Sequence, residues 1–372
     1  MEQQPISQRQ FMALSFLAML SPFLRLIPGR IAQLAGPVAW VTPVVAFPLL
    51  VGLAALIFRV LKNTQPGEGL SLVTIRVLGN FFGKALVLVW SAWLIFHAGF
   101  TLRSGADRFV ATVYTNSQPW PFVAIMAVLG LITSLGRAKT LARSAELFRP
   151  MMVVVLLLII LFALPDLELN YLLPVTLDDA LPVLSGGIIV TDVISLAIFA
   201  SAFLKGYKDS QLPKTGHFVI FFIISCILAS LICAITIGLF GSTLTARLSY
   251  PFFSLVRDET IVFTMERVEA LVVGLWVLPD FILISIELII ASDNLMLLFG
   301  GKKETQRLFY WKSGGKYVWF CVGLAVLVAV VLLRDPQDFL QWSNIRIPIM
   351  NLTICFGTAV LLFAVGKVRK RI

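Results

Sequence analysis

Long apolar segments constrain this chain more than any other feature. Most of them run for roughly 17–25 residues, the length of helix that crosses a bilayer, in a chain that is 59% hydrophobic and only 13% charged. Backbone groups in lipid must be hydrogen-bonded inside the protein, so such segments form helices or a closed barrel. They lack the alternation of apolar and polar residues that strands require. The chain is therefore predicted to be an all-α polytopic membrane protein.

Ten transmembrane helices are predicted, separated by polar or turn-rich segments. Their ranges are 11–34, 38–58, 84–111, 119–135, 147–165, 181–204, 217–240, 266–298, 317–333 and 347–366. We expect one integral membrane domain over residues 1–372, made of two halves of five spans each, at about 11–165 and 181–366.

Lysine and arginine are distributed unevenly between alternate loops. With the N-terminus in the cytoplasm, 21 of the 30 Lys and Arg residues fall on the inner side. Basic loops are retained in the cytoplasm, so both termini are predicted to be cytoplasmic. The net charge of +10 then reflects anchoring at the membrane surface, and no nucleic-acid partner is expected.

No catalytic or cofactor motif accompanies the spans. The sequence has no HExxH, no P-loop and no nucleotide-binding GxGxxG, the patterns that indicate zinc or nucleotide chemistry. It has only two histidines, and its four cysteines all lie inside apolar runs without a CxxC pair. We therefore predict no enzyme activity, no metal and no cofactor, and free buried thiols. The apolar N-terminal run leads into further spans and lacks a cleavable signal pattern.

Two segments five spans apart carry helix-disrupting residues. The first span contains Pro22, and the sixth contains Gly186, Gly187 and, near its middle, Asp192. Interrupted segments at equivalent positions of two halves indicate an inverted-repeat transporter with its site at the break. We therefore predict a LeuT-like 5+5 inverted repeat with interrupted helices 1 and 6. The alternative is a simple proline kink in span 1 and close glycine packing in span 6.

Four ionisable residues, Arg25, His97, Asp192 and Asp280, lie near the middle of their spans. Charges at that depth are costly and usually mark function. Their spans are the first, third, sixth and eighth, which line the substrate site in transporters of the LeuT type. Alternatively, each is a structural hydrogen-bonded group, and Arg25 extends outward to water.

We place the candidate ligand site at the break of span 1, against span 6. The residues expected to bind the ligand are Ser21, Phe23, Arg25, His97, Gly187, Asp192 and Asp280. Arg25 would attract an anionic group, Asp192 or Asp280 an amine, and Phe23 would shape an apolar wall.

The eighth predicted span has an acidic face. Glu269, Asp280 and Glu287 are separated by 11 and 7 residues, which at about 100° per residue places them within roughly 20° of one another. Trp276 lies on the same side. An acidic face cannot contact lipid, so it should face the interior. The predicted charge network comprises Glu266, Arg267, Glu269 and Glu287. The alternative is a set of salt bridges to arginines of neighbouring helices.

An apolar stretch interrupts the long loop between the seventh and eighth spans. It includes Tyr250, Pro251 and Phe252. Such a stretch in an aqueous loop is predicted to pack on the mouth of the bundle as a lid, or to lie passively at the interface.

Three sequence blocks resemble the B subunit of spore germinant receptors, in the amino acid–polyamine–organocation superfamily. They are Ile6-Ser7-x-x-Gln10, the block from Tyr250-Pro251 through Glu266-Arg267-Val268-Glu269, and the following Trp276. The sequence departs from the family at the span 1 break, where Ser21-Pro22-Phe23 replaces a Gly-x-Gly element. Pro22 has no N–H to offer a carboxylate, so Arg25 becomes the candidate anion contact.

The resemblance implies a ten-span LeuT-like subunit in the inner membrane of a bacterial endospore. It implies a small nutrient ligand, often an amino acid, and two partners: a membrane-embedded A subunit and a lipoprotein C subunit. Ligand binding would then lead to the release of ions and dipicolinate. From the residues alone, a secondary transporter of amino acids or related solutes is supported equally, and a structural or conducting subunit without a ligand is a third alternative.

Overall fold

Every regular element in the described part of the chain is helical. The computed structural model describes residues 6–61, 69–112, 114, 116–136, 138–202, 215–257, 274–300 and 315–369. The first helix begins at a capping box, in which the Ser7 hydroxyl accepts from the Gln10 N–H and the Gln10 side chain accepts from the Ser7 N–H. Two of the orphan donors of the helix start are thus satisfied.

The helices follow one another in two groups along the chain. The first group is α1 (Gln8–Ala35), η1 (Gly36–Val41), α2 (Thr42–Leu61), α3 (Leu70–Leu78), α4 (Asn80–Thr112), α5 (Trp120–Leu135) and α6 (Ala138–Ala163). The second is η2 (Leu169–Leu172), η3 (Leu177–Asp179), α7 (Ala180–Ala202), α8 (Thr215–Arg247), α9 (Pro251–Arg257), α12 (Val277–Phe299), α14 (Lys316–Leu327), η4 (Val328–Leu332), α15 (Pro336–Gln341), η5 (Trp342–Arg346) and α16 (Ile347–Val368).

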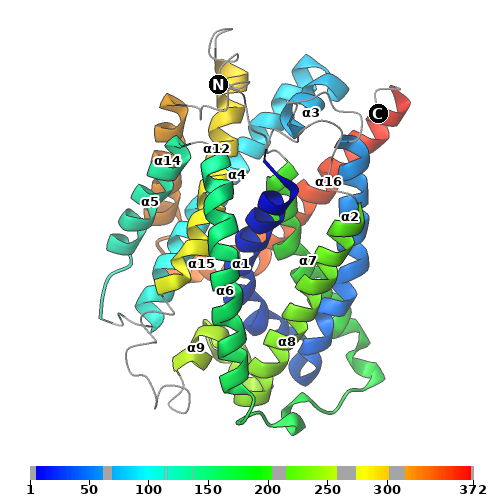
Figure 1. Cartoon of the computed structure of the whole chain (residues 1–372), viewed down its shortest axis with the longest axis vertical. Helices are drawn as coiled ribbons and strands as arrows, with labels where there is room; N and C mark the ends of the chain where they lie inside the picture. The colour runs from blue at the N-terminus through cyan, green and yellow to red at the C-terminus, as the bar shows by residue number, and fades with distance from the viewer. Residues whose placement is uncertain are drawn as a thin grey trace.

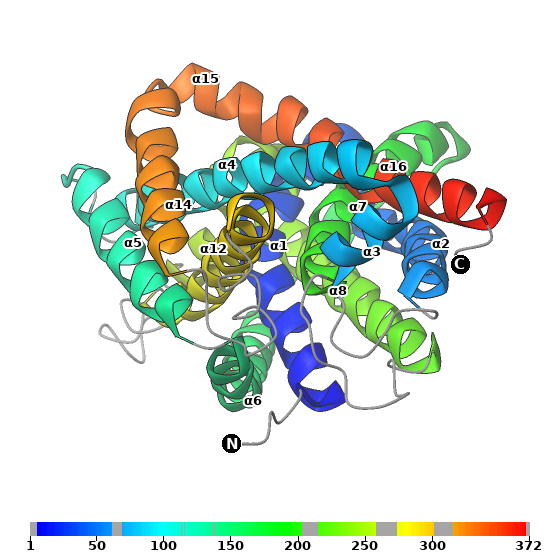
Figure 2. The ribbon, with the colours of Figure 1, turned by 90° about the horizontal axis from the view of Figure 1, so that it is seen from above.

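Helix α1 is the centre of the bundle. It contacts α6, α7, α8 and α12, and Figure 2 shows these helices surrounding it. On one side α4 packs against α12 and α14, and on the other α2 packs against α7, α8 and α16. Both termini lie toward one end of the bundle, and α9 lies toward the opposite end (Figure 1). The first helices of the two halves, α1 and α7, are therefore in direct contact.

Each predicted span overlaps an observed helix, but α6 begins nine residues before the predicted start at 147, and residues 266–273 of the eighth predicted span lie outside the described residues. Seven stretches of the described chain are helical, long and apolar enough to cross a membrane. One of them, 9–61, contains both α1 and α2, and two shorter apolar helices, at Trp120–Leu135 and Lys316–Leu332, fall below that length. The count of ten spans thus stays a prediction. Helix α3, at the terminus end, was not predicted.

The predicted interruptions of helices 1 and 6 are not seen as breaks. Helix α1 continues from Gln8 to Ala35 through Pro22 and Pro28, and α7 is continuous from Ala180 to Ala202. A proline removes one backbone hydrogen bond and clashes with the preceding turn. Inside a packed bundle, neighbouring helices allow such a helix to bend without unwinding. The structure therefore corrects the two breaks to continuous helices.

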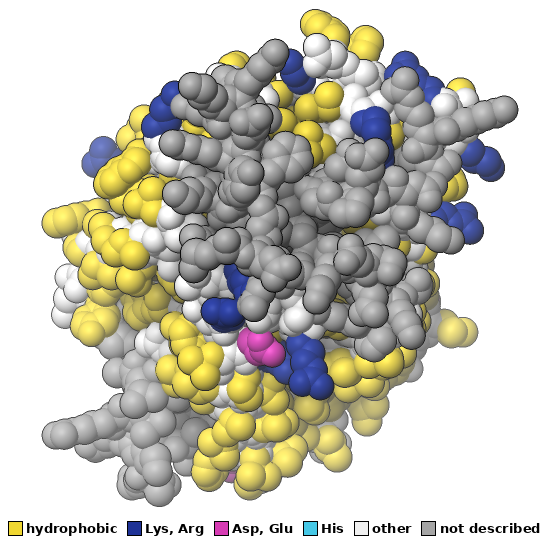
Figure 3. Space-filling view, turned by 45° about the horizontal axis from the view of Figure 1, so that its top comes forward, with side chains coloured by type: hydrophobic (Ala, Val, Ile, Leu, Met, Phe, Trp, Pro, Cys, Tyr) yellow, Lys and Arg dark blue, Asp and Glu magenta, His cyan; other side chains and the backbone are white. Residues whose placement is uncertain are grey.

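The polarity of the bundle is that of a protein in lipid. Leucine, isoleucine and valine are exposed along the flanks of α5 and α6, whereas charged residues of α1, α4 and α12 are buried. Figure 3 shows the end that carries the termini turned forward, with Lys and Arg side chains around it and hydrophobic side chains on the flank. An apolar exterior with polar groups inside is the arrangement that a bilayer favours. The chain is a multi-pass membrane protein.

Candidate functional site

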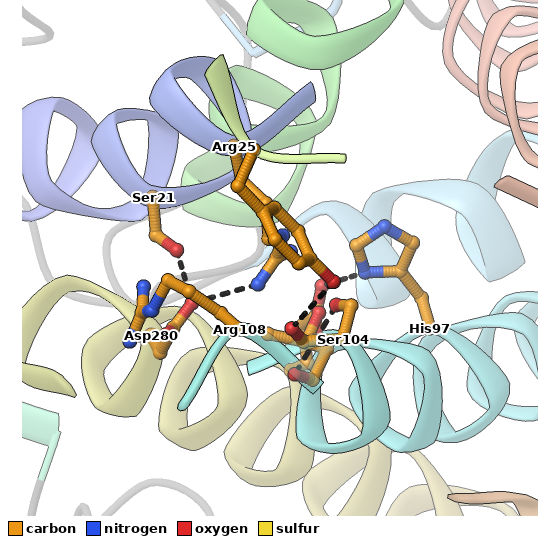
Figure 4. Close-up of polar contacts among 9 residues, drawn as sticks. Ser21, Arg25, His97, Ser104, Arg108 and Asp280 are labelled. Carbon is orange, nitrogen blue, oxygen red and sulfur yellow. Dashed lines mark hydrogen bonds and ion pairs between the residues drawn. The ribbon is translucent and has the colours of Figure 1, made fainter. Parts of the chain in front are cut away.

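Asp280 is the hub of a buried ionic centre, which we define as Arg25, Arg108 and Asp280. One Asp280 oxygen accepts from the Ser21 hydroxyl and lies 3.1 Å from Arg25 Nη1, and the other lies 3.0 Å from Arg108 Nη2. Figure 4 shows Ser21 and Arg25 reaching Asp280 from α1, while Arg108 approaches from α4. Asp280 is buried and faces α1 and α4, which agrees with the predicted inward orientation of the acidic face.

The ionic centre carries more positive than negative charge. All three charged side chains are fully buried, and two guanidinium groups share one carboxylate. Arg108 also lies over the ring of Phe253, 4.9 Å from its centroid, where the negative ring face attracts a cation. Arg25 does not extend to water, as one alternative held, because Asp280 holds it inside the bundle. The alternative of salt bridges to neighbouring arginines is the one seen at Asp280.

A second polar pair lies along the same helix contact. His97 Nδ1 is 2.7 Å from Glu287 Oε1, and both residues are buried. His97 precedes Arg108 on α4, whereas its partner Glu287 follows Asp280 on α12, so the two helices run antiparallel. We call this contact the charged seam: His97 and Arg108 of α4 with Asp280 and Glu287 of α12. Asp280 and Glu287 face the interior together, as the acidic face predicted.

Helix α9 covers the ionic centre at the end away from the termini. The Tyr250 hydroxyl donates to the Ser104 carbonyl oxygen at 3.4 Å, and Phe252 stacks on Trp276 with ring centroids 6.0 Å apart. A Cβ placed on Gly29 of α1 would lie 3.3 Å from Pro251 Cγ, so α9 approaches α1 closely. The predicted packing of this segment on the bundle mouth is confirmed, and its action as a lid stays a prediction.

A cavity of about 580 Å³ opens beside the ionic centre. We call it the arginine cavity. Helices α1, α4, α15 and the end of α8, the turn η5 and the segment between α8 and α9 supply its lining. The charged and polar residues of the lining are Arg25, Arg30, Gln33, Arg103, Ser104, Asp107, Arg247, Ser249, Tyr250, Ser343 and Asn344. Its volume lies in the range that small-molecule sites occupy.

Asp192 does not reach this site. It is buried on α7, where its carboxylate accepts from Asn351 Nδ2 of α16 at 2.7 Å. Asn351 in turn accepts from Trp93 Nε1 at 2.9 Å. Asp192 does not line the arginine cavity, and its role in holding a ligand amine stays a prediction.

The glycines of α7 serve packing. A Cβ on Gly186 would lie 2.5 Å from Thr42 Cγ2, and one on Gly187 would lie 3.0 Å from Val45 Cβ. Both glycines therefore let α7 approach α2, which was the alternative to a ligand-binding Gly187. Phe23 is fully buried in the core and is absent from the cavity lining.

Three residues of the predicted charge network, Glu266, Arg267 and Glu269, lie outside the described residues. Arg30 and Arg108 were not among the predicted site residues. Residues 97, 101, 104 and 108 of α4 are all buried polar groups at alternating spacings of four and three. That spacing places them on one helix face, so it was a signal for Arg108. Arg30 had no such signal, because its partner is the Ser343 backbone and hydroxyl.

The fold and the buried charges define a polytopic membrane protein whose helical bundle encloses charged side chains. The chain is similar to a solved structure of Mhp1, a nucleobase-cation-symport-1 family transporter in a closed conformation with bromovinylhydantoin bound. The TM-score is 0.67 at 12% sequence identity, over 97% of this chain and 78% of that one. At this identity the likeness shows the LeuT-like fold alone.

The sequence comparisons identify the family. A family model described as spore germination protein matches residues 5–339. The chain is also 23% identical over 279 residues to spore germination protein YndE of Bacillus subtilis (strain 168), covering 73% of this chain and 74% of that protein. This chain belongs to the spore germination protein family, as its sequence blocks had indicated.

Proposed function

We propose that this protein is the membrane subunit of a spore germinant receptor that binds a small nutrient in the arginine cavity. The observation that carries the proposal is the position of the ionic centre, because Arg25 both lines the cavity and holds Asp280. A solute that competes for Arg25 would alter the α1–α12 contact. A ligand shifts a conformational equilibrium only through such differential contacts.

A test on spores examines the function directly. Spores lacking the gene should lose dipicolinate release in response to at least one nutrient of a broad panel. Reintroducing the gene should restore that response, whereas the Arg25→Gln variant should shift its dose–response curve to higher concentration. A deletion strain that responds normally to every nutrient would reject the receptor function.

Secondary transport is the second candidate, and the fold shared with Mhp1 favours it. The two functions differ in net movement of solute. A receptor binds its nutrient without accumulating it, whereas a transporter accumulates it in proteoliposomes when an ion gradient is imposed. Uptake of the radiolabelled nutrient that triggers germination therefore separates the two.

We further propose an endospore inner-membrane location with both termini cytoplasmic, and assembly with a membrane-embedded A subunit and a lipoprotein C subunit. The charge distribution supports the orientation. A cysteine at Asp178 should react with an impermeant reagent from outside, and one at Lys367 should not. The four native cysteines are buried, which keeps background labelling low. Labelling at Lys367 but not Asp178 would reverse the topology. Co-purification of both partner subunits with the tagged chain tests the assembly.

A further inference from the structure

The lining of the arginine cavity is strongly unbalanced in charge. Four arginines contribute to it, Arg25, Arg30, Arg103 and Arg247, whereas Asp107 is the one acidic residue among the described lining residues. A concave site lined by one sign of charge concentrates solutes of the opposite sign.

The carboxylate in the lining, Asp107, and the one directly behind it, Asp280, are already paired, whereas Asp192 acts on Arg30 through its charge and accepts from Asn351. Asp107 pairs with Arg103, with its Oδ2 2.9 Å from Arg103 Nε. Asp280, behind the lining, is held by Arg25, Arg108 and the Ser21 hydroxyl. A ligand ammonium would therefore have to displace a guanidinium from its partner. The ammonium group of a zwitterion would therefore add little binding free energy to what its carboxylate contributes.

Guanidinium nitrogens, by contrast, are available. Arg30 is 6% exposed and donates through Nη2 to the Ser343 carbonyl and hydroxyl, while its Nε and Nη1 have no hydrogen-bond partner. Arg25 is 1% exposed, and its Nε and Nη2 are likewise unpartnered. Buried donors without partners are costly. Arg25 and Arg30 are five residues apart on α1, and both line the same cavity.

We propose that the arginine cavity binds a small organic anion through its carboxylate groups, with Arg25 and Arg30 as the anchoring residues. The planar guanidinium fork matches a carboxylate bidentately. An anion would satisfy the unpartnered nitrogens and offset the excess positive charge of the ionic centre. This inference rests on the proposed function, since it names the chemical class of the nutrient.

Succinate, its uncharged diamide succinamide, and the zwitterion alanine are suitable probes. Each is added to the purified full-length protein in nanodiscs, and the melting temperature is measured against concentration, because ligands of the native state raise apparent stability. Succinate should raise the melting temperature, and succinamide should not. Arg30→Gln should weaken the apparent affinity for succinate by roughly 10- to 100-fold, the loss of a charged hydrogen bond. Arg334→Gln, at an exposed arginine outside the cavity, should leave the affinity unchanged.

The inference would be overturned if succinamide raised the melting temperature as much as succinate, or if alanine raised it more. It would also be overturned if succinate had no effect on the wild-type protein, or if Arg30→Gln left the affinity for succinate unchanged. If Arg30→Gln fails to fold, Arg30→Lys, which keeps the charge but loses the planar fork, should bind succinate more weakly than wild type. The function is tested separately on spores. If carboxylates bind but deletion spores germinate normally, the receptor function fails and the site stands. If deletion removes a response to a neutral or zwitterionic nutrient alone, the function stands and the anion site fails.

Discussion

Two midspan aspartates, Asp280 of α12 and Asp192 of α7, are equally buried, at no more than 1% exposure, yet their surroundings differ. Asp280 lies between two arginines, so its carboxylate holds α1, α4 and α12 together by charge. The partner that Asp192 contacts is the neutral amide of Asn351, which links α7 to α16.

The difference shows that two kinds of contact hold this bundle. On the α4–α12 side, ion pairs connect the helices, and breaking one leaves a buried charge. On the α7 side, the glycines of α7 allow close van der Waals packing against α2. A solute can compete for an ion pair, whereas it has no means of entering a tight glycine contact. The charged seam is therefore the side where ligand binding can alter helix contacts.

Asp280→Asn should have the largest effect of the substitutions considered. The substitution leaves Arg25 and Arg108 buried without a counter-charge, which costs about 3–5 kcal/mol in comparable pairs. We expect a large fall in melting temperature and in the yield of folded protein, measured by thermal melts and size-exclusion chromatography. A variant as stable as wild type would show that the ionic centre contributes nothing to the α1–α12 contact.

Gly186→Ala tests the packed side. The new Cβ would lie 2.5 Å from Thr42 Cγ2, and the Thr42 hydroxyl is held by the Ala39 carbonyl at 2.8 Å. Overpacking of this kind costs about 1–3 kcal/mol. Gly52→Ala on α2 is the matched control, since its Cβ would meet nothing within 4 Å. Equal melting temperatures for the two variants would contradict the packing role.

Glu287→Gln should be tolerated better than Asp280→Asn. Its partner His97 can keep a hydrogen bond with an amide, so we expect a loss of about 1 kcal/mol. Thermal melts of both variants in the same nanodiscs measure the difference. If Glu287→Gln destabilises the protein more than Asp280→Asn does, the ranking of the two pairs within the charged seam is reversed.

Asp192→Asn should have the smallest effect, below about 1 kcal/mol, because an amide oxygen can still accept from Asn351. The affinity for the nutrient should change little, since Asp192 is not in the cavity lining. A direct role for Asp192 in ligand binding stays a prediction, and the same measurement tests it. A shift in nutrient affinity as large as that of Arg25→Gln would return Asp192 to the site.

The fold could be predicted from the sequence because a hydrophobic run long enough to cross a membrane can adopt few structures other than a helix. The positions of the spans and the burial of Arg25, His97, Asp192 and Asp280 followed from the same pattern. The continuity of α1 could not be predicted from this pattern. A proline indicates that one backbone hydrogen bond is lost, but it does not show whether the neighbouring helices allow α1 to continue without it.

The partners within the site were harder to predict than its members. A one-dimensional pattern shows that Asp280 faces inward, but not that Arg108 and Arg25 meet it there. Glycine is equally ambiguous, because the residue that unwinds a helix also permits close packing. Gly187 was assigned to the ligand site on this ambiguity, and Asp192 on its charge near the middle of a span. Their contacts with α2 and α16 could not be predicted, because those helices are distant in sequence.

The π-helical turn η5 has a consequence for how this family can vary. Its five residues, Trp342–Arg346, connect α15 to α16 without a gap, and Ser343 within it accepts from Arg30. A π turn accommodates one residue more than an α turn. Deletion of a single codon there would restore a regular α-helix and rotate α15 by about 100° relative to α16. Loss or gain of one residue, with no change of side-chain chemistry, would thus decide whether Arg30 keeps its acceptor.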